Sequence, residues 1–69
     1  MEIEEIVAKN LRTVMAEKNI SGVELSRYTG LSESTIHYIK NGNISGIRFN
    51  TLQKISECFE VPVDYFFQP

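Results

Sequence analysis

The chain has 69 residues and a formal net charge of −2, with 7 Lys+Arg against 9 Asp+Glu. This length suits one domain spanning residues 1–69, and no apolar run approaches the roughly 18 residues of a membrane-spanning helix. The single cysteine, Cys58, excludes an internal disulfide, and one cysteine with one histidine is too few for a protein-only metal cage. No signal peptide precedes the first expected helix, so we expect a cytoplasmic protein with no membrane partner, no metal and no cofactor.

The charges are unevenly distributed along the chain. Three glutamates lie within the first five residues, and three further acidic residues lie after residue 56. Residues 6–56 contain all seven basic side chains and three glutamates, so their net charge is +4 (seven minus three). A basic middle suits a polyanionic partner, although a nucleic-acid-binding domain is usually basic overall.

The first expected helix spans residues 3–18. Three glutamates lie at its start, where their negative charge interacts favourably with the positive end of the helix dipole and stabilises the helix. Apolar residues recur along it at intervals of three and four, which predicts one buried stripe. The members of this stripe are Ile3, Ile6, Val7, Leu11, Val14 and Met15.

A second expected helix, residues 22–29, is marked at both ends. Ser21 and Glu24 have the spacing of a capping box, and Ile20 with Leu25 has the spacing of a hydrophobic staple. Gly30 ends the helix, because glycine adopts the left-handed conformation without a steric cost.

A third expected helix spans residues 33–40, between the N-cap Ser32 and the pair Asn41-Gly42. Its inward residues are isoleucines, and the opposite face is either a solvated surface or a binding surface. That face consists of Glu33, Ser34, His37, Tyr38 and Asn41. Two short helices joined by a tight turn over residues 21–42 have the geometry of a helix-turn-helix.

The remaining residues predict two more helices. A fourth is expected over residues 50–59, with Asn50 and Gln53 as a capping box. A short fifth helix at residues 61–67 would carry Pro62 in its first turn. The expected fold is therefore an all-α, compact five-helix domain.

Two blocks of sequence resemble one known family. Residues 25–42 read LSxxxGLSxxTIxxIxNG, and residues 49–67 read FxTLxxISxxFxVxVDxFF. In this order and spacing they resemble the lambda-repressor-like, Xre/Cro-type helix-turn-helix family of DNA-binding regulators, over about residues 6–67. The resemblance implies a sequence-specific regulator of transcription, a repressor, that inserts helix 33–40 into the major groove of double-stranded DNA.

The resemblance implies base contacts from helix 33–40. The family usually reads bases with the first two residues of this helix and one residue a turn later, which are Glu33, Ser34 and Tyr38 here. Glu33 can only accept hydrogen bonds, so it suits a cytosine amino group, or else it stabilises the first turn of the helix. Tyr38 would meet a thymine methyl group or a phosphate, or stay plainly exposed. His37 is either a further contact or a surface residue.

The resemblance also implies contacts with the DNA backbone. The family commonly has a phosphate-binding glutamine at the position of Gly22, which here offers only backbone N–H groups. Arg48, in a loop at residues 43–48, is either a phosphate contact or a solvated charge. The expected backbone contacts are Ser21, Gly22, Arg27, Ser32, Lys40, Asn41, Asn43 and Arg48.

The chain departs from the family pattern at three further positions. Many members bury an ion pair at the positions of Met15 and Lys40, which cannot form one. We expect the Lys40 stem to pack on or near Met15, with its ammonium in solvent or on a phosphate. Glu60 occupies a position where the family often has a left-handed glycine, so mild strain is expected there.

The C-terminal aromatic residues leave two interpretations open. Val63 and Phe66 are expected to complete the core, whereas Tyr65 and Phe67 either help to close it or form a homodimer contact. The resemblance implies dimerisation through this region, because relatives often dimerise there.

The composition argues against an enzyme, since the sequence has no glycine-rich phosphate loop, no paired carboxylates and no catalytic triad. No small-molecule ligand is evident. The alternative function is a protein–protein interaction module, antitoxin- or anti-repressor-like, that retains the helix-turn-helix fold with weak or no DNA binding. Gly22, Glu33 and the net charge of −2 favour that alternative.

Overall fold

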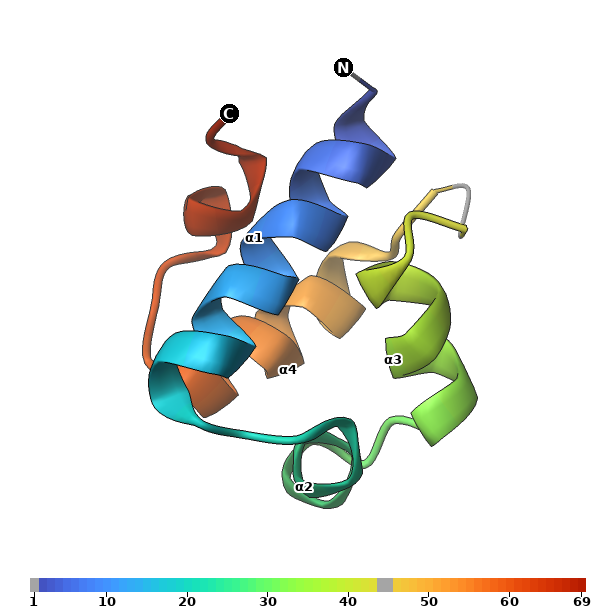
Figure 1. Ribbon diagram of the computed structural model, residues 1–69, viewed down its shortest axis with the longest axis vertical. Coiled ribbons are helices and arrows are strands. Elements are labelled where there is room, and N and C mark those ends of the chain that lie inside the picture. The colour runs from blue at the N-terminus through green and yellow to red at the C-terminus, as the bar shows by residue number, and fades with distance from the viewer. Residues whose placement is uncertain (1, 44–45) are drawn as a thin grey trace.

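The computed structural model describes residues 2–43 and 46–69 (Figure 1). Their regular elements are all helical: α1 (Ile3–Lys18), α2 (Gly22–Thr29), α3 (Glu33–Lys40), α4 (Phe49–Phe59) and the 3-10 helix η1 (Val63–Phe67). α1 packs against α3 and η1, and α2 packs against α3 and α4. The all-α class and the bounds of the first three helices are confirmed as predicted.

Side-chain caps determine where α2 and α3 begin. Ser21 Oγ accepts the Glu24 N–H (3.1 Å), and Glu24 Oε1 accepts the Ser21 N–H (3.0 Å), which is the predicted capping box. Ser32 Oγ accepts the Thr35 N–H (3.1 Å) at the start of α3. Gly30 ends α2 at a φ of 77°, the left-handed conformation that glycine adopts readily. Local chemistry therefore fixes both helices of the helix-turn-helix.

The predicted start of the fourth helix is wrong. α4 begins at Phe49, its N-cap is Arg48, and no side chain caps it, so Asn50 and Gln53 form no capping box. The Arg48 carbonyl accepts the Leu52 N–H (3.2 Å), which already closes the first helical turn. The N-cap thus lies two residues before Asn50, and the helix starts one residue before the predicted residue 50.

The predicted fifth helix, at residues 61–67, is shorter than expected, and it is a 3-10 helix rather than an α-helix. η1 is a 3-10 helix of five residues, with Pro62 as an extended N-cap. Its Tyr65 N–H bonds to the Pro62 carbonyl (3.0 Å). At its other end, Asn10 Nδ2 of α1 donates to the carbonyls of Phe66 (2.9 Å) and Gln68 (2.8 Å). A side chain of another helix therefore holds this segment in place. The described residues therefore contain four α-helices and one 3-10 helix rather than five α-helices.

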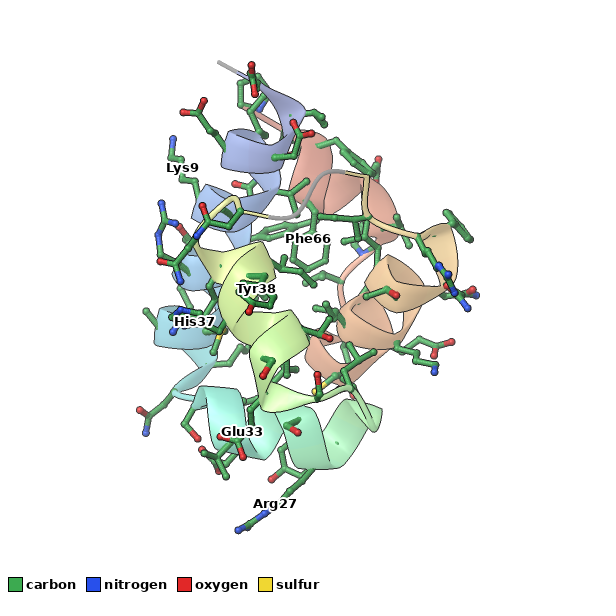
Figure 2. All side chains as sticks on the ribbon, turned by 90° about the vertical axis from the view of Figure 1, so that its right-hand side faces the viewer. Lys9, Arg27, Glu33, His37, Tyr38 and Phe66 are labelled. Atoms are coloured by element: carbon green, nitrogen blue, oxygen red, sulfur yellow. The ribbon has the colours of Figure 1, made fainter. Side chains whose placement is uncertain are left out.

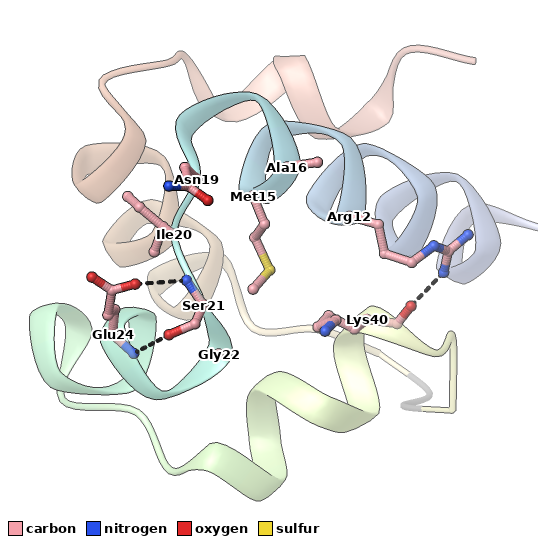
Figure 3. A pocket seen from close by; sticks show the side chains of 9 residues that line it. All are labelled: Arg12, Met15, Ala16, Asn19, Ile20, Ser21, Gly22, Glu24 and Lys40. Atoms are coloured by element: carbon pink, nitrogen blue, oxygen red, sulfur yellow. Dashed lines mark hydrogen bonds between the residues drawn. The ribbon is translucent and has the colours of Figure 1, made fainter.

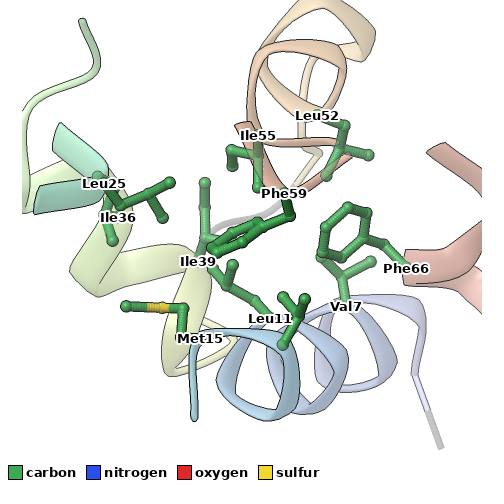
Figure 4. Close-up of a cluster of buried hydrophobic side chains, with 11 residues drawn as sticks. Val7, Leu11, Met15, Leu25, Ile36, Ile39, Leu52, Ile55, Phe59 and Phe66 are labelled. Carbon is green, nitrogen blue, oxygen red and sulfur yellow. The ribbon is translucent and has the colours of Figure 1, made fainter. Parts of the chain in front are cut away.

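A single hydrophobic core joins the helices (Figure 4). Its buried members are Val7, Leu11, Val14, Met15, Leu25, Ile36, Ile39, Leu52, Ile55, Phe59 and Phe66. Phe66 is fully buried, as predicted, although it lies near the C-terminus. Burying a side chain of this size stabilises a fold by about 1.5–3 kcal/mol, so η1 is an integral part of the core.

Two helices end on a left-handed residue that is not glycine. Asn19 (φ 55°) closes α1, and Glu60 (φ 56°) closes α4. After Glu60 the N–H of Val61 bonds back to the Ser56 carbonyl (3.0 Å). The backbone geometry expected at Glu60 is thus present, and for a residue with a Cβ it costs roughly 1–2 kcal/mol.

Candidate nucleic-acid interface

α3 presents one polar face to solvent. Its inward residues, Ile36 and Ile39, are each 1% exposed, and they fix the rotation of the helix about its axis. All the residues predicted to contact bases are exposed, namely Glu33, Ser34, His37 and Tyr38. In Figure 2 the labelled residues of α3 lie between Arg27 of α2 at one end and Lys9 of α1 at the other.

Side-chain contacts order the last turn of α3. Asn41 Nδ2 donates to the His37 carbonyl (2.8 Å) and lies 3.3 Å from His37 Nδ1. The Tyr38 ring meets the His37 ring edge-on, with centroids 6.0 Å apart. Tyr38 is still 51% exposed, so its ring and hydroxyl are open to a partner. These contacts restrict the three side chains in advance, which lowers the entropy lost on binding.

The N-terminus of α2 carries its own carboxylate. The hydrogen bond from the Ser21 N–H to Glu24 lowers the pKa of Glu24, and the Ser21 hydroxyl adds to the effect. Glu24 is therefore anionic at neutral pH, at the helix end where a phosphate would be favoured. A Cβ on Gly22 would lie 3.9 Å from Ile36 Cγ2, an ordinary van der Waals contact, so this position has room for a side chain.

Lys40 and Met15 line an open hollow of about 660 Å³ where α1, α2 and α3 meet (Figure 3). Met15 is 6% exposed and Lys40 is half-buried. Both residues thus line the same hollow, and the packing of the Lys40 stem on Met15 stays a prediction. The Lys40 carbonyl accepts a hydrogen bond from Arg12 Nη1 of α1.

Most of the other predicted backbone contacts are exposed. They are Ser21, Arg27, Ser32, Asn41, Asn43 and Arg48. The Ser32 hydroxyl serves the cap of α3 and also bonds to Thr35 Oγ1 (2.8 Å). Arg48 lies at the start of α4, whereas residues 44–45 of the predicted loop lie outside the described residues.

Sequence reasoning missed two basic side chains of α1, Lys9 and Arg12. Both are exposed, and both line a hollow of about 220 Å³ beside Asn41 and Gly42, at the end of α3. Their spacing of three residues places them on one side of α1, away from its apolar stripe. That spacing can indicate two basic side chains on one side of α1, but it does not indicate that α3 lies next to them.

The two aromatic residues predicted at a dimer contact have different surroundings. Tyr65 is half-buried, meets Phe66 edge-on with centroids 5.2 Å apart, and packs against the core. Burial raises the pKa of its hydroxyl. Phe67 is 41% exposed and lines a hollow of about 250 Å³ with Ile3 and Ile47. Phe67 therefore presents the larger free apolar surface.

Within residues 2–43 and 46–69, no helix is long and apolar enough to cross a membrane. The same residues contain no group of three His, Cys, Asp or Glu side chains placed to hold a metal ion. Cys58 is half-buried, and its burial raises the pKa of the thiol, which keeps it protonated at neutral pH.

Comparison with known proteins adds two similarities. Residues 10–64 match the family described as the Cro/C1-type HTH DNA-binding domain. The chain is also similar to YozG of Bacillus subtilis (strain 168), described as an uncharacterized HTH-type transcriptional regulator, with 31% identity over 51 residues. The matched region covers 74% of this chain and 61% of that protein, so the chain spans about three fifths of the relative's length. No solved structure shows a significant match.

Proposed function

Because the chain belongs to the Cro/C1-type helix-turn-helix family of DNA-binding domains, we propose that it regulates transcription by binding double-stranded DNA at specific sequences. It acts as a repressor in the cytoplasm, by occupying a promoter. The observation that carries this proposal is the exposed polar face of α3, which two buried isoleucines hold toward solvent. A helix of this kind enters the major groove and reads the edges of bases there.

The residues on α3 have distinct roles in this proposal. Ser34 donates or accepts at almost any base and discriminates little, whereas Glu33 accepts from a cytosine amino group. Tyr38 places its exposed ring against a thymine methyl group, and His37 lies beside it. Sequence discrimination therefore comes mainly from Glu33 and Tyr38.

The backbone contacts surround this helix. Arg27 and Arg48 are exposed arginines that neutralise phosphates, and Lys40 does so from its half-buried position. Further contacts come from the polar groups of Ser21, Gly22, Ser32, Asn41 and Asn43. With about three to four phosphate contacts per subunit, the log–log slope of affinity against salt should be near −3.

The protein acts as a homodimer with its contact at Phe67 and the neighbouring Tyr65. The exposed Phe67 ring beside an apolar hollow supports this assignment, because exposed aromatic side chains are enriched at interfaces. A two-fold dimer would read two half-sites about 34 Å apart, one turn of the duplex.

Selection from a random duplex pool, at low and at physiological salt, tests the proposal. Enrichment of an inverted repeat with half-sites one turn apart would support a dimeric regulator and supply its site. An unrepeated site would support a monomer. No enrichment, even at low salt, would contradict DNA binding.

Two substitutions then test the assigned residues on the selected duplex. Tyr38→Ala should reduce discrimination between the selected duplex and a one-base variant by about tenfold, because a good base contact is worth about 1–3 kcal/mol. Arg48→Ala should weaken binding to every duplex alike and reduce the salt slope by about one. Unchanged binding in both variants would refute the site.

One observation favours the second candidate, a protein-interaction module. Glu24 holds an anionic carboxylate at the start of α2, and Glu33 places another in the first turn of α3. Two carboxylates at helix ends that would face phosphates weaken DNA binding, and the net charge of −2 acts in the same sense. A selection from the random duplex pool that enriches no sequence would favour this function, and the next step would be a search for a protein partner.

A further inference from the structure

The carbonyl groups at the end of α3 all have hydrogen-bond partners. An α-helix leaves its last four carbonyls without intrahelical partners. Groups of Asn41, Gly42 and Asn43, which follow α3 directly, satisfy three of them. The fourth, the Lys40 carbonyl, accepts from Arg12 Nη1, which lies 28 residues earlier in α1. The end of the proposed recognition helix is thus closed by one tertiary contact.

This contact lies on the seam between α1 and α3. Figure 3 shows Arg12 reaching from α1 toward the backbone of Lys40. Next to it the chain passes directly over α1, since a Cβ on Gly42 would lie 3.6 Å from the Glu4 carbonyl and 3.8 Å from Ala8 Cβ. The chain leaving α3 therefore packs against the first turns of α1. One turn further along α1, Arg12 holds the end of α3.

A guanidinium suits this position for three physical reasons. It is permanently charged and has several N–H donors in a planar fork. Its bond to a carbonyl is charge-assisted, and it lies at the negative end of the α3 dipole. Met15 and Lys40 cannot form an ion pair in its place, because Met15 is neutral, and Lys40 has the same sign of charge as Arg12. The polar link between the two helices therefore runs through a backbone oxygen.

On the premise that α3 reads bases, we propose that Arg12 is a positioning residue that fixes the last turn of α3 on α1 and thereby sharpens base discrimination. His37 and Tyr38 lie in this last part of α3. Loosening the Arg12 contact lets both side chains shift relative to the bases. Because hydrogen bonds weaken steeply with distance and angle, such a shift reduces discrimination more than overall affinity.

The test compares three variants on the selected duplex and on the same duplex with one base pair changed. Arg12→Gln removes the charge and the fork, Arg12→Lys keeps the charge, and Lys54→Gln, on the exposed side of α4, is the control for net charge. Arg12→Gln should reduce the ratio of the two dissociation constants about fivefold, a loss expected for one exposed charge-assisted hydrogen bond. Its salt slope should equal that of Lys54→Gln, and Arg12→Lys should recover only part of the ratio.

Hydrogen exchange in the free protein gives a readout that does not depend on DNA. In Arg12→Gln the amides of Asn41, Gly42 and Asn43 should exchange faster, while the amides of α4 keep their protection. If Arg12→Gln does not fold, Arg12→Lys should show the same pattern to a smaller extent.

Two outcomes would overturn the proposal. A uniform loss of affinity on both duplexes, with a salt slope smaller by about one and full recovery in Arg12→Lys, would make Arg12 a phosphate contact. Unchanged exchange at the three amides would show that Arg12 does not hold α3. If the unaltered protein selects no duplex, the proposed function fails instead, and the exchange result still decides whether Arg12 fixes the helix.

Discussion

The helix-turn-helix and the C-terminal third of the chain are stabilised in different ways. α2 and α3 each begin with a serine whose hydroxyl accepts a backbone N–H three residues later. α4 and η1 begin without any side-chain cap. η1 is held by the buried ring of Phe66 and by the side-chain amide of Asn10, which comes from α1. The first region is shaped by its own sequence, and the second depends on the rest of the fold.

The largest expected effect comes from removing the ring that anchors η1. Phe66→Ala should lower the free energy of unfolding by about 3–5 kcal/mol, because it leaves a cavity in the core. A domain of this size has little more stability than that. Chemical denaturation measures the change, and the control Phe49→Ala, at a ring that is 66% exposed, should stay within about 1 kcal/mol of the unaltered protein. Equal losses in both variants would contradict the assigned role of Phe66.

Removing the amide that holds the same segment should have a smaller effect. Asn10→Ala deletes two hydrogen bonds, to the carbonyls of Phe66 and Gln68, and should lower the free energy of unfolding by about 1–2 kcal/mol. Limited proteolysis should then cut near the C-terminus before it cuts α2 or α3. Cleavage that begins in α2 or α3 would show that the two regions are not separately stabilised.

The matching change in the other region is the loss of a cap. Ser32→Ala should cost about 1 kcal/mol, because the first N–H groups of α3 lose their acceptor. Hydrogen exchange should rise in the first turn of α3 and stay unchanged in η1. Ser34→Ala is the control, because Ser34 lies two residues further along the helix and does not cap it. Equal exchange in the two variants would show that the Ser32 hydroxyl does not stabilise the first turn of α3.

The smallest expected effect is a gain of stability at Glu60. Glu60→Gly relieves the left-handed strain at the end of α4 but adds freedom to the unfolded chain, so a net gain of about 0.5–1 kcal/mol is expected. Thermal unfolding measures it, with Glu60→Ala as the control that keeps the Cβ. A loss of stability in the glycine variant would mean that the Glu60 side chain makes a stabilising contact.

This difference between the two regions also explains how far the sequence could predict the fold. Ser21, Glu24, Gly30 and Ser32 are local signals, and the bounds of α2 and α3 follow from them. α4 and η1 offer no such signals, since Arg48 caps α4 with its backbone alone and η1 is held by Asn10, more than fifty residues earlier. A capping pattern at residues 50–53 therefore predicted the wrong start, and nothing in the short apolar segment at residues 61–67 indicated that its helix would be a 3-10 helix.

The candidate site divides in the same way. The outward face of α3 follows from helical periodicity, because Ile36 and Ile39 must face the core. The contact of Arg12 with the Lys40 carbonyl joins two helices, and no local pattern in either helix indicates it. Similarly, the sequence does not show that Glu24 would place its carboxylate where a phosphate would bind, although it does show the capping box that causes this.

The space at Gly22 bears on how long the protein stays on its site. In the proposed complex, a residue at the start of α2 that has room for a side chain but lacks one leaves a phosphate without a side-chain hydrogen bond. Differences in affinity among related complexes lie mostly in their dissociation rates. For the proposed DNA complex we therefore expect brief residence, measurable as a fast dissociation rate that Gly22→Gln slows. Occupancy would then follow the cellular concentration of the protein closely, and a regulator of this kind can be withdrawn as quickly as it is degraded or diluted.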